Sequence, residues 1–460
     1  MKVFVIGLDC APPKIVFEQC RHLLPNLSKL MAAGCYAPLL SSDPPITVPA
    51  WMCMLTGKDS GELGFYGFRN RKDYSYNSLV FANSLAVKEP TVWDLLSAAG
   101  KKSILVGVPQ TYPPKPLNGL VVTDILTPSK ESQWTYPASL QAEVEAVTGG
   151  YSFDVKEFRT PDKEYLLEQV FLMTEKRFKL ARHLAVTKPW DFFMLVEMGP
   201  DRLQHGFWRY FDPTHRLFTP NNKYQRVIAE YYQFLDTKIG QLLAVLPKDS
   251  IVLVVSDHGA KAMAGGVCIN DWLRQEGYLK LKSEPKESQK LDLALVDWQQ
   301  TVAWGEGGYY SRIFLNVKDR EPEGLVAPSN YQEVRLELKE KLEKMLDHQG
   351  QPLNNKVLLP EEIYKATKNI PPDLMVYFGD LNWRSVGTVG NSSIYVFEND
   401  TGPDDANHDY WGIFIASYLD GRKLPWQQKE YYSIYDVMPL LTKTVYSVSP
   451  DLTSDISCKS

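Results

Sequence analysis

The amino-acid sequence predicts an α/β fold, with a doubly wound, mainly parallel sheet and helices on both faces. Short apolar runs rich in β-branched residues alternate with longer amphipathic stretches over residues 1–260, which is the order typical of βαβ units. The chain has 460 residues, of which 44% are hydrophobic and 23% charged. This composition is that of a globular protein with a large core, and it excludes collagen-like, disordered and disulfide-rich classes.

Four segments are expected to be strands of the main sheet. Residues 2–8 are rich in β-branched residues and end in Gly-Leu-Asp, so they form a buried first strand with an acid at its carboxyl tip. Residues 103–108 and 191–197 have the same character, and residues 251–256 are the most apolar strand in the chain.

Start and stop signals locate the helices between these strands. Residues 26–34 end at a glycine, residues 50–56 follow a proline and also end near a glycine, and residues 91–100 begin with a threonine cap. Residues 164–186 and 224–246 are long amphipathic helices.

The segment after residue 259 differs in composition. It contains a Lys- and Gln-rich stretch at 280–290 and a charged helix at 331–346. We interpret residues 261–369 as a cap inserted into a core formed by residues 1–260 and 370–460. The apolar runs 374–378 and 413–416 are expected to return to the main sheet.

Charge and cysteine usage exclude several functions. The 50 Lys and Arg against 55 Asp and Glu leave a formal net charge of −5, which argues against binding a nucleic-acid duplex. No apolar run approaches the roughly 18 residues of a membrane span. The six cysteines show no CxxC spacing and read as free thiols, so a cytoplasmic location is expected.

Acidic residues follow three of the predicted strands. Asp9, Asp201 and Asp257 each come just after a strand. In doubly wound sheets the ligand lies at the carboxyl ends of the strands. The three carboxylates are therefore expected at one edge of the sheet.

Histidines accompany these acids. Asp201 and His205 are four residues apart and would share one face of a helix, as metal-chelating pairs do, although the spacing also arises by chance. Asp257, His258 and a glycine end the most apolar strand, and the alternative to metal ligation there is an acid–imidazole hydrogen bond in a turn. His408 follows a polar turn and by itself would be a surface histidine.

Thr47 lies just before a predicted helix, where free N–H groups favour anions. Its alternative role is that of a plain helix cap. Together with the three acids and three histidines it forms a set of nitrogen and oxygen donors, which suits zinc or manganese. The set is large enough for two ions, which would clamp a phosphoryl group while the threonine acts as nucleophile.

The chain resembles the type I phosphodiesterase/nucleotide pyrophosphatase branch of the alkaline phosphatase superfamily, and more closely its prokaryotic phosphohydrolase/phosphomutase group. The motifs that carry this resemblance span nearly the whole chain in family order. They are VIGLDCA (5–11), PPITVPAW (44–51), VPQTYPPKPLNG (108–119), DRLQHGFWRYFDPTH (201–215), SDHGA (256–260), YYSRIFLNVKDREPEG (309–324), PPDL (371–374) and the segment around His408.

The resemblance implies an alkaline-phosphatase-like fold and two divalent ions, with Zn²⁺ favoured and Mn²⁺ as the alternative. It implies that Asp9, Thr47, Asp257 and His258 hold one ion, while Asp201, His205 and His408 hold the other. It further implies that Thr47 is the nucleophile and forms a phospho-threonine intermediate that water hydrolyses.

Four further residues in these motifs are candidates for substrate binding: Arg202, His215, Arg312 and Arg320. The alternatives are a structural salt bridge for Arg202, a turn cap for His215 and a solvated cap face for the other two.

The sequence departs from the family pattern at two places. Glu62 and Leu63 occupy the position where the family has a histidine, and residues 451–454 replace the usual Asp-Gly pair. The aromatic residues Phe65, Tyr66 and Phe68 that follow either stack on a substrate ring or fill the cap interface, and packing is favoured.

The sequence thus predicts a metal-dependent hydrolase that cleaves a phosphomonoester or phosphodiester of a small molecule. A cofactor-independent phosphomutase is the first alternative, although such enzymes usually carry a serine nucleophile. A non-catalytic binding protein that keeps the fold is the second, and the complete ligand set argues against it. Substrate identity and oligomeric state stay open.

Overall fold

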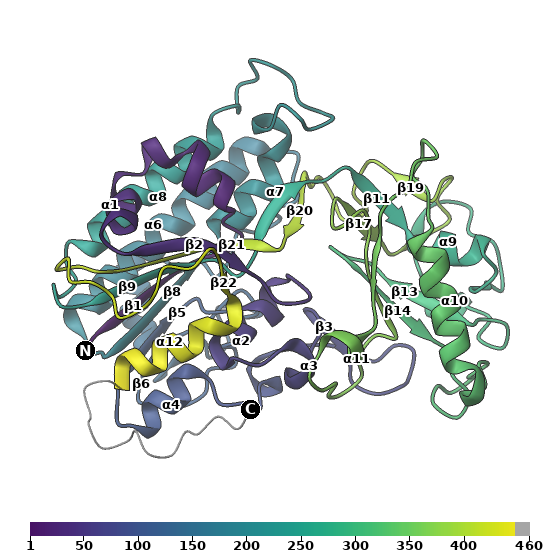
Figure 1. Cartoon of the computed structure of the whole chain (residues 1–460), viewed down its shortest axis with the longest axis horizontal. Helices are drawn as coiled ribbons and strands as arrows, with labels where there is room; N and C mark the ends of the chain where they lie inside the picture. Colours follow the sequence, from purple (N-terminus) through teal and green to yellow (C-terminus); the bar gives the residue numbers. More distant parts are fainter. Residues whose placement is uncertain (447–460) are drawn as a thin grey trace.

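The computed structural model describes residues 1–446 and consists of two lobes (Figure 1). The larger lobe is built on a nine-stranded sheet, and the smaller lobe contains a four-stranded and a three-stranded sheet. The predicted α/β class is confirmed.

The centre of the large sheet is parallel and fully buried. Strand β1 (Val3–Leu8) lies between β8 (Phe192–Glu197) and β9 (Ile251–Val255), and it is parallel to both. Strands β5 (Ser103–Val106) and β6 (Gly119–Val122) continue the parallel part beyond β8. Near-continuous apolar runs are typical of strands covered on both faces, which is why the sequence indicated them clearly.

The edges of the sheet contain the antiparallel pairings. Strand β21 (Trp411–Tyr418) lies between β9 and β2 (Cys35–Leu40) and is antiparallel to both, so the expected return of residues 413–416 to the main sheet is confirmed. The short strands β22 (Tyr432–Ser433) and β7 (Thr135–Tyr136) close the two edges.

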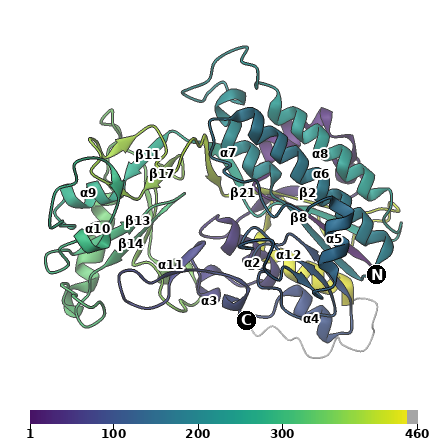
Figure 2. The ribbon, with the colours of Figure 1, turned by 180° about the vertical axis from the view of Figure 1, so that it is seen from behind.

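Helices cover both faces of this sheet (Figures 1 and 2). On one face α6, the longest helix described, packs against α5, α7 and α8, and α8 also packs against α1. On the other face α12 packs against α2 and α4. The bounds are α1 (Pro25–Ala33), α2 (Thr47–Thr56), α4 (Val92–Ala98), α5 (Leu140–Thr148), α6 (Lys163–Thr187), α7 (Gly199–Phe211), α8 (Val227–Leu243) and α12 (Ile434–Tyr446).

Local signals explain where two of these helices begin and end. Thr91 caps α4 as expected, and its hydroxyl and the Asp94 carboxylate form a capping box. Helix α2 begins at Thr47 rather than at Ala50, because a proline is well tolerated in a first helical turn and Pro49 lies inside that turn. It ends at Gly57, whose φ of 68° is left-handed.

The small lobe contains its own sheets and core. Its four-stranded sheet has the order β13-β14-β16-β15, and its three-stranded sheet the order β17-β11-β19. The bounds are β11 (Gly265–Cys268), α9 (Ile269–Gln275), β13 (Ala303–Glu306), β14 (Ser311–Leu315), α10 (Tyr331–Glu343), β15 (Lys356–Leu358), α11 (Pro360–Ile363), β16 (Leu374–Tyr377), β17 (Trp383–Val386) and β19 (Tyr395–Val396). The pair β12 (Gln289–Lys290) and β18 (Thr388–Val389) lies in the same region of the chain.

One expectation about this lobe is wrong. Residues 374–378 were expected in the main sheet, but β16 is antiparallel to β14 and β15 and belongs to the small lobe. Its apolar run predicts a strand that is buried on both faces, but it does not indicate to which sheet the strand belongs. We therefore propose that the insertion extends to β19 instead of ending at residue 369.

Two connections join the lobes. The antiparallel pair β10 (Gly259–Ala262) and β20 (Ala406–Asp409) carries the chain between them. An excursion of the large lobe, with α3 (Ser60–Leu63), β3 (Arg69–Arg71) and β4 (Leu79–Phe81), reaches the small lobe. There Arg71 forms a buried ion pair with Glu321 at 3.0 Å, and the Tyr76 ring stacks on Trp298.

Within residues 1–446, no helix has the length and apolar character needed to cross a membrane.

We predict that Leu253→Ala, which truncates a fully buried side chain in β9, lowers the free energy of unfolding by about 2–5 kcal/mol, because it removes apolar contacts and leaves a cavity. The matched control is Leu336→Ala on α10, where the side chain is 52% exposed and the change should stay within about 0.5 kcal/mol. Urea unfolding followed by circular dichroism measures both. Equal losses in the two variants would contradict the proposed central position of β9.

Candidate metal centre

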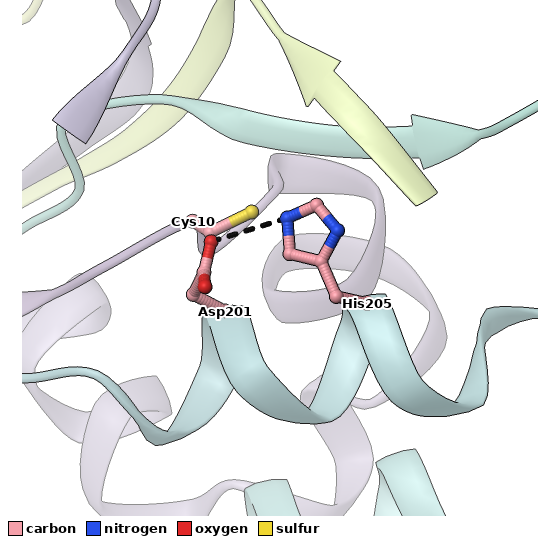
Figure 3. Close-up of side chains that lie close together, drawn as sticks. All are labelled: Cys10, Asp201 and His205. Atoms are coloured by element: carbon pink, nitrogen blue, oxygen red, sulfur yellow. Dashed lines mark ion pairs between the residues drawn. The ribbon is translucent and has the colours of Figure 1, made fainter. Parts of the chain in front are cut away.

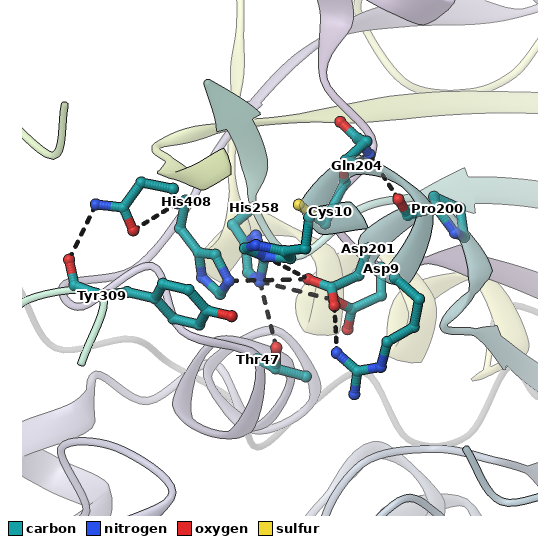
Figure 4. A network of polar contacts seen from close by, with 12 residues as sticks. Asp9, Cys10, Thr47, Pro200, Asp201, Gln204, His258, Tyr309 and His408 are labelled. Atoms are coloured by element: carbon teal, nitrogen blue, oxygen red, sulfur yellow. Dashed lines mark hydrogen bonds and ion pairs between the residues drawn. The ribbon is translucent and has the colours of Figure 1, made fainter. Parts of the chain in front are cut away.

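The predicted ligands converge at the carboxyl ends of three neighbouring strands (Figure 4). Asp9 directly follows β1, Asp257 follows β9, and Asp201 lies in the first turn of α7 after β8. Because β8, β1 and β9 are adjacent and parallel, their carboxyl ends meet at the same edge of the sheet. All three carboxylates are at most 2% exposed.

Asp9, Asp257 and His258 form one group of possible metal ligands. The His258 Nε2 atom is 3.2 Å from Asp257 Oδ2 and 3.7 Å from Asp9 Oδ1. Strand β10 begins immediately after His258, so the turn between β9 and β10 brings the imidazole back over the end of the sheet.

Asp201 lies between the other two histidines. Its Oδ1 atom is 3.3 Å from His205 Nε2 and 3.8 Å from His408 Nε2. Asp201 and His205 share one face of α7, as their spacing indicates. His408 is not a surface histidine: it is 1% exposed and lies in β20, opposite Ala260 of β10.

Thr47 is the first residue of α2, and its side chain points toward this cluster (Figure 4). The Oγ1 atom is 3.3 Å from His258 Nε2. The N-cap position belongs to Ile46 and carries no side-chain hydrogen bond, so Thr47 does not act as a plain cap. Its hydroxyl therefore lies at a helix N-terminus among potential metal ligands.

The three carboxylates of the cluster differ in how readily they ionise. Burial, followed by the neighbouring carboxylates, raises the pKa of Asp9 and Asp257 well above the usual range. Burial opposes ionisation of Asp201 too, but His205 and Arg202 outweigh it and hold the pKa of Asp201 well below the usual range. A divalent cation would favour the ionised form of all three carboxylates.

The histidines fall into two kinds. Burial lowers the pKa of His258 to about 4 and holds that of His408 well below its usual value, so both rings are neutral and can act as ligands. Burial also disfavours a charged His205, yet Asp404 and Asp201 raise the pKa of His205 well above its usual value. A proton on His205 Nε2 would occupy the position that a metal ion takes.

Unpaired buried atoms support a fit to metal ions. Asp9 Oδ1, Asp257 Oδ2 and His205 Nε2 are buried and have no hydrogen-bond partner. Unpaired buried polar atoms are costly, so such atoms need a ligand, a water or an ion. Nitrogen and carboxylate oxygen donors converging here suit a divalent ion such as zinc or manganese.

Neighbouring groups orient the ligands. Trp51 Nε1 donates to Asp9 Oδ2 at 2.7 Å, and His408 Nδ1 donates to the Pro45 carbonyl at 2.7 Å. His205 Nδ1 donates to Asp404 Oδ1 at 2.7 Å. These bonds direct the Nε2 atoms of His408 and His205 into the cluster, as outer partners of metal-binding histidines do.

Four residues of this centre were not predicted from the sequence: Asp404, Arg159, Tyr309 and Cys10. Asp404 accepts a hydrogen bond from Arg159 Nε at 2.9 Å as well as that of His205. The Tyr309 ring, from the small lobe, stacks on His408 with ring centroids 3.9 Å apart. Cys10 lies close to Asp201 and His205. Asp404 precedes His408 by four residues and Cys10 follows Asp9, but neither position points to a role without the fold.

The predicted substrate residues lie outside the cluster or are already paired. Arg202 is buried and bound to carboxylates: it pairs with Asp201 and forms two hydrogen bonds of 2.8 Å to Asp154. His215 is buried, accepts a hydrogen bond from the Leu217 N–H at 3.1 Å, and has a pKa lowered by burial to about 4. These contacts match the structural alternatives for both residues.

The other two arginines belong to the small lobe. Arg312 on β14 donates to the Arg69 carbonyl. Arg320 pairs with Asp373 at 2.8 Å and with Glu321 at 2.9 Å. Neither arginine is among the contacts of the metal-ligand cluster.

Among residues 1–446, the departures from the family pattern have local structural explanations. Glu62 completes the capping box of α3 and pairs with Lys58 at 3.1 Å. Phe65 is buried in the large core, while Tyr66 packs against Tyr364 between the lobes and donates to the Lys368 carbonyl at 2.8 Å. Residues 451–454 lie outside the described part of the chain.

Solved structures with the same architecture define the fold. Phosphonoacetate hydrolase from Sinorhizobium meliloti, in complex with phosphonoacetate, is 15% identical with a TM-score of 0.62, and the match covers 97% of this chain and 96% of that one. Human ectonucleotide pyrophosphatase/phosphodiesterase 5 is 14% identical with a TM-score of 0.56, covering 97% and 95%. An inactive variant of the murine protein in complex with AMP has the same values. The fold is therefore that of alkaline-phosphatase-like hydrolases.

The chain belongs to the type I phosphodiesterase/nucleotide pyrophosphatase family, which it matches over residues 3–411. The resemblance indicated by the motifs is thereby confirmed, and the family indicates a phosphoric ester hydrolase. No curated protein sequence matches the chain.

We predict that Asp404→Asn weakens the binding of a divalent ion, tested with Zn²⁺, by about 10–100-fold, because the His205 ring loses the carboxylate that orients it. The control is Asp400→Asn, which removes a more distant partner of Arg384, at 3.7 Å. Competition with a chromogenic chelator measures both affinities. Unchanged zinc affinity in Asp404→Asn would show that the contact between Asp404 and His205 does not support metal binding.

Proposed function

We propose that this protein is a two-metal phosphohydrolase that cleaves a phosphomonoester or phosphodiester of a small molecule through a phospho-threonine at Thr47. The supporting observation is the position of the Thr47 hydroxyl. It lies at the N-terminus of α2, 3.3 Å from His258 Nε2, beside a buried cluster of three carboxylates and three imidazoles.

The donor set divides into two ion sites. Asp9, Thr47, Asp257 and His258 would hold one ion, and Asp201, His205 and His408 the other. Zn²⁺ is favoured and Mn²⁺ is the alternative, because the donors are imidazole nitrogens and carboxylate oxygens. When bound, such a pair of ions neutralises the phosphoryl oxygens and makes the hydroxyl and water more acidic.

The chain's own residues prepare the reaction in two ways. The first turn of a helix leaves N–H groups without intrahelical partners, so the start of α2 favours an anionic phosphoryl group beside Thr47. Burial keeps His258 and His408 neutral, so their nitrogens can serve as donors. Trp51 and Pro45 hold Asp9 and His408 in place, which preserves the geometry around the nucleophile.

The proposed chemistry has two steps. Thr47 Oγ1 attacks phosphorus and forms a P–O bond while the bond to the leaving alcohol oxygen breaks. Water then attacks the phospho-threonine, which releases the phosphate product and restores the hydroxyl.

The ligands bound in similar structures support a small phosphorus-containing anion as substrate. One neighbour was solved with phosphonoacetate and another with AMP. These two ligands set the range of compounds to test.

We predict that Thr47→Ala lowers turnover by about 10³-fold or more while folding and metal content stay unchanged, because the nucleophile is lost and six other ligands remain. Thr47→Ser should keep part of the activity. The matched control is Thr56→Ala at the other end of α2, where the hydroxyl donates to the Met52 carbonyl at 2.6 Å and accepts from the Lys58 N–H at 3.2 Å. Phosphate release and metal analysis test this, and full activity of Thr47→Ala would refute the nucleophile assignment.

We also expect a chelator to abolish hydrolysis and Zn²⁺ or Mn²⁺ to restore it. The metal-loaded protein should be screened against phosphomonoesters, phosphodiesters, nucleotides and phosphonates with phosphate detection. Release of free phosphate supports the hydrolase. Interconversion of phosphate isomers without release would instead identify a phosphomutase, and the absence of bound metal after reconstitution would favour a binding protein.

A further inference from the structure

Cys10 has an unusual backbone conformation beside the metal centre. It directly follows Asp9 and has a φ of 63°, the left-handed region that side chains other than glycine seldom adopt. Its N–H donates to Asp257 Oδ1 at 3.3 Å, and its carbonyl accepts from Gln204 Nε2 at 2.6 Å. Strained conformations of this kind persist where the surroundings determine them, and they cluster at functional sites.

This conformation directs the thiol toward two of the proposed ligands. Cys10 Sγ, one Asp201 oxygen and one His205 nitrogen all lie within 4.8 Å of one another (Figure 3). All three residues are at most 2% exposed. His205 Nε2 faces Asp201 Oδ1 at 3.3 Å as an ion pair but forms no hydrogen bond, so it is a buried nitrogen that could bind a metal ion.

Other cysteines do not share this position. Among residues 1–446, the groups that can hold a metal contain no other cysteine. Cys268, for example, is equally buried, but it ends a strand of the small lobe. Free buried cysteines usually act as small apolar residues. Cys10 differs because a carboxylate and an imidazole surround its sulfur.

We propose that the Cys10 thiolate is an additional ligand of the ion held by Asp201, His205 and His408, and that it makes this ion site selective for Zn²⁺ over Mn²⁺. This inference rests on the proposed two-metal function. Thiolate is a soft ligand that zinc binds well, whereas manganese prefers carboxylate oxygen and water. The donor set then contains sulfur, nitrogen and oxygen, and zinc can accept a fifth ligand during a reaction.

The thiol must lose its proton when the ion binds. In the structure the thiol donates to the Gly259 carbonyl at 3.4 Å. A divalent ion favours deprotonation of a coordinating thiol, and the proton would leave to solvent. Ligation of the sulfur would then take the place of this hydrogen bond.

Cobalt substitution tests this proposal. A thiolate bound to Co²⁺ produces a sulfur-to-cobalt charge-transfer absorption in the near ultraviolet, separate from the visible bands that any Co²⁺ site shows. The wild-type protein titrated with Co²⁺ should show both. Cys10→Gly should lose the charge-transfer band and keep the visible bands, because glycine accepts the positive φ and leaves the backbone contacts intact. Cys268→Ser, which replaces an equally buried thiol, should retain both.

Metal affinity provides a second measurement on the same variants. We expect the zinc affinity of the site formed by Asp201, His205 and His408 to fall about tenfold or more in Cys10→Gly, while its manganese affinity stays the same. Titration calorimetry with each metal measures the ratio. An unaltered ratio, or Co²⁺ bound to wild type without a charge-transfer band, would overturn the role of Cys10 and leave the two-metal proposal standing. A protein that binds no Co²⁺ at all would overturn both.

Discussion

The close approach of three carboxylates at one edge of the sheet is the constraint on which the rest of the structure depends. Asp9, Asp201 and Asp257 come from neighbouring strand ends, where the parallel order of β8, β1 and β9 leaves them little room to separate. Water does not screen their repulsion, because all three are buried. The surrounding cluster therefore consists of groups that either supply positive charge, as Arg202 does, or offer donors to a cation.

The small lobe is part of this centre rather than a separate attachment. It contributes Tyr309, which stacks on His408, while the pair β10 and β20 places His258 and His408 side by side with ring centroids 3.8 Å apart. Near the start of α2, Ile46 packs in a small cluster with tyrosines from both lobes. Movement of one lobe against the other would therefore disturb Thr47 and the candidate ligands together.

The arginines show how the protein distributes charge around the site. Arg159 and Arg384 both face Asp404, which in turn holds His205, while Arg202 pairs with Asp154 and Asp201. Removing one member of such a network leaves a buried charge without a partner, which is strongly destabilising. These arginines thus hold the carboxylates around the candidate ligands. Arg320 in the small lobe is also paired with two carboxylates, but it does not contact the candidate ligands.

The sequence by itself determined the fold class, the main strands and the family, because strand and helix periodicity is local and because each acid directly follows a recognisable strand. It could not assign β16 to a sheet, since a covered strand has the same pattern in either lobe. Nor could it reveal Asp404 beside His205, the carboxylates around Arg202 and Arg320, or the sulfur of Cys10 beside Asp201. Those contacts join side chains that are mostly far apart in the chain, and only tertiary packing decides which of them meet. For Cys10 the deciding factor is a single backbone angle, which contacts with Asp257 and Gln204 support and which no sequence pattern predicts.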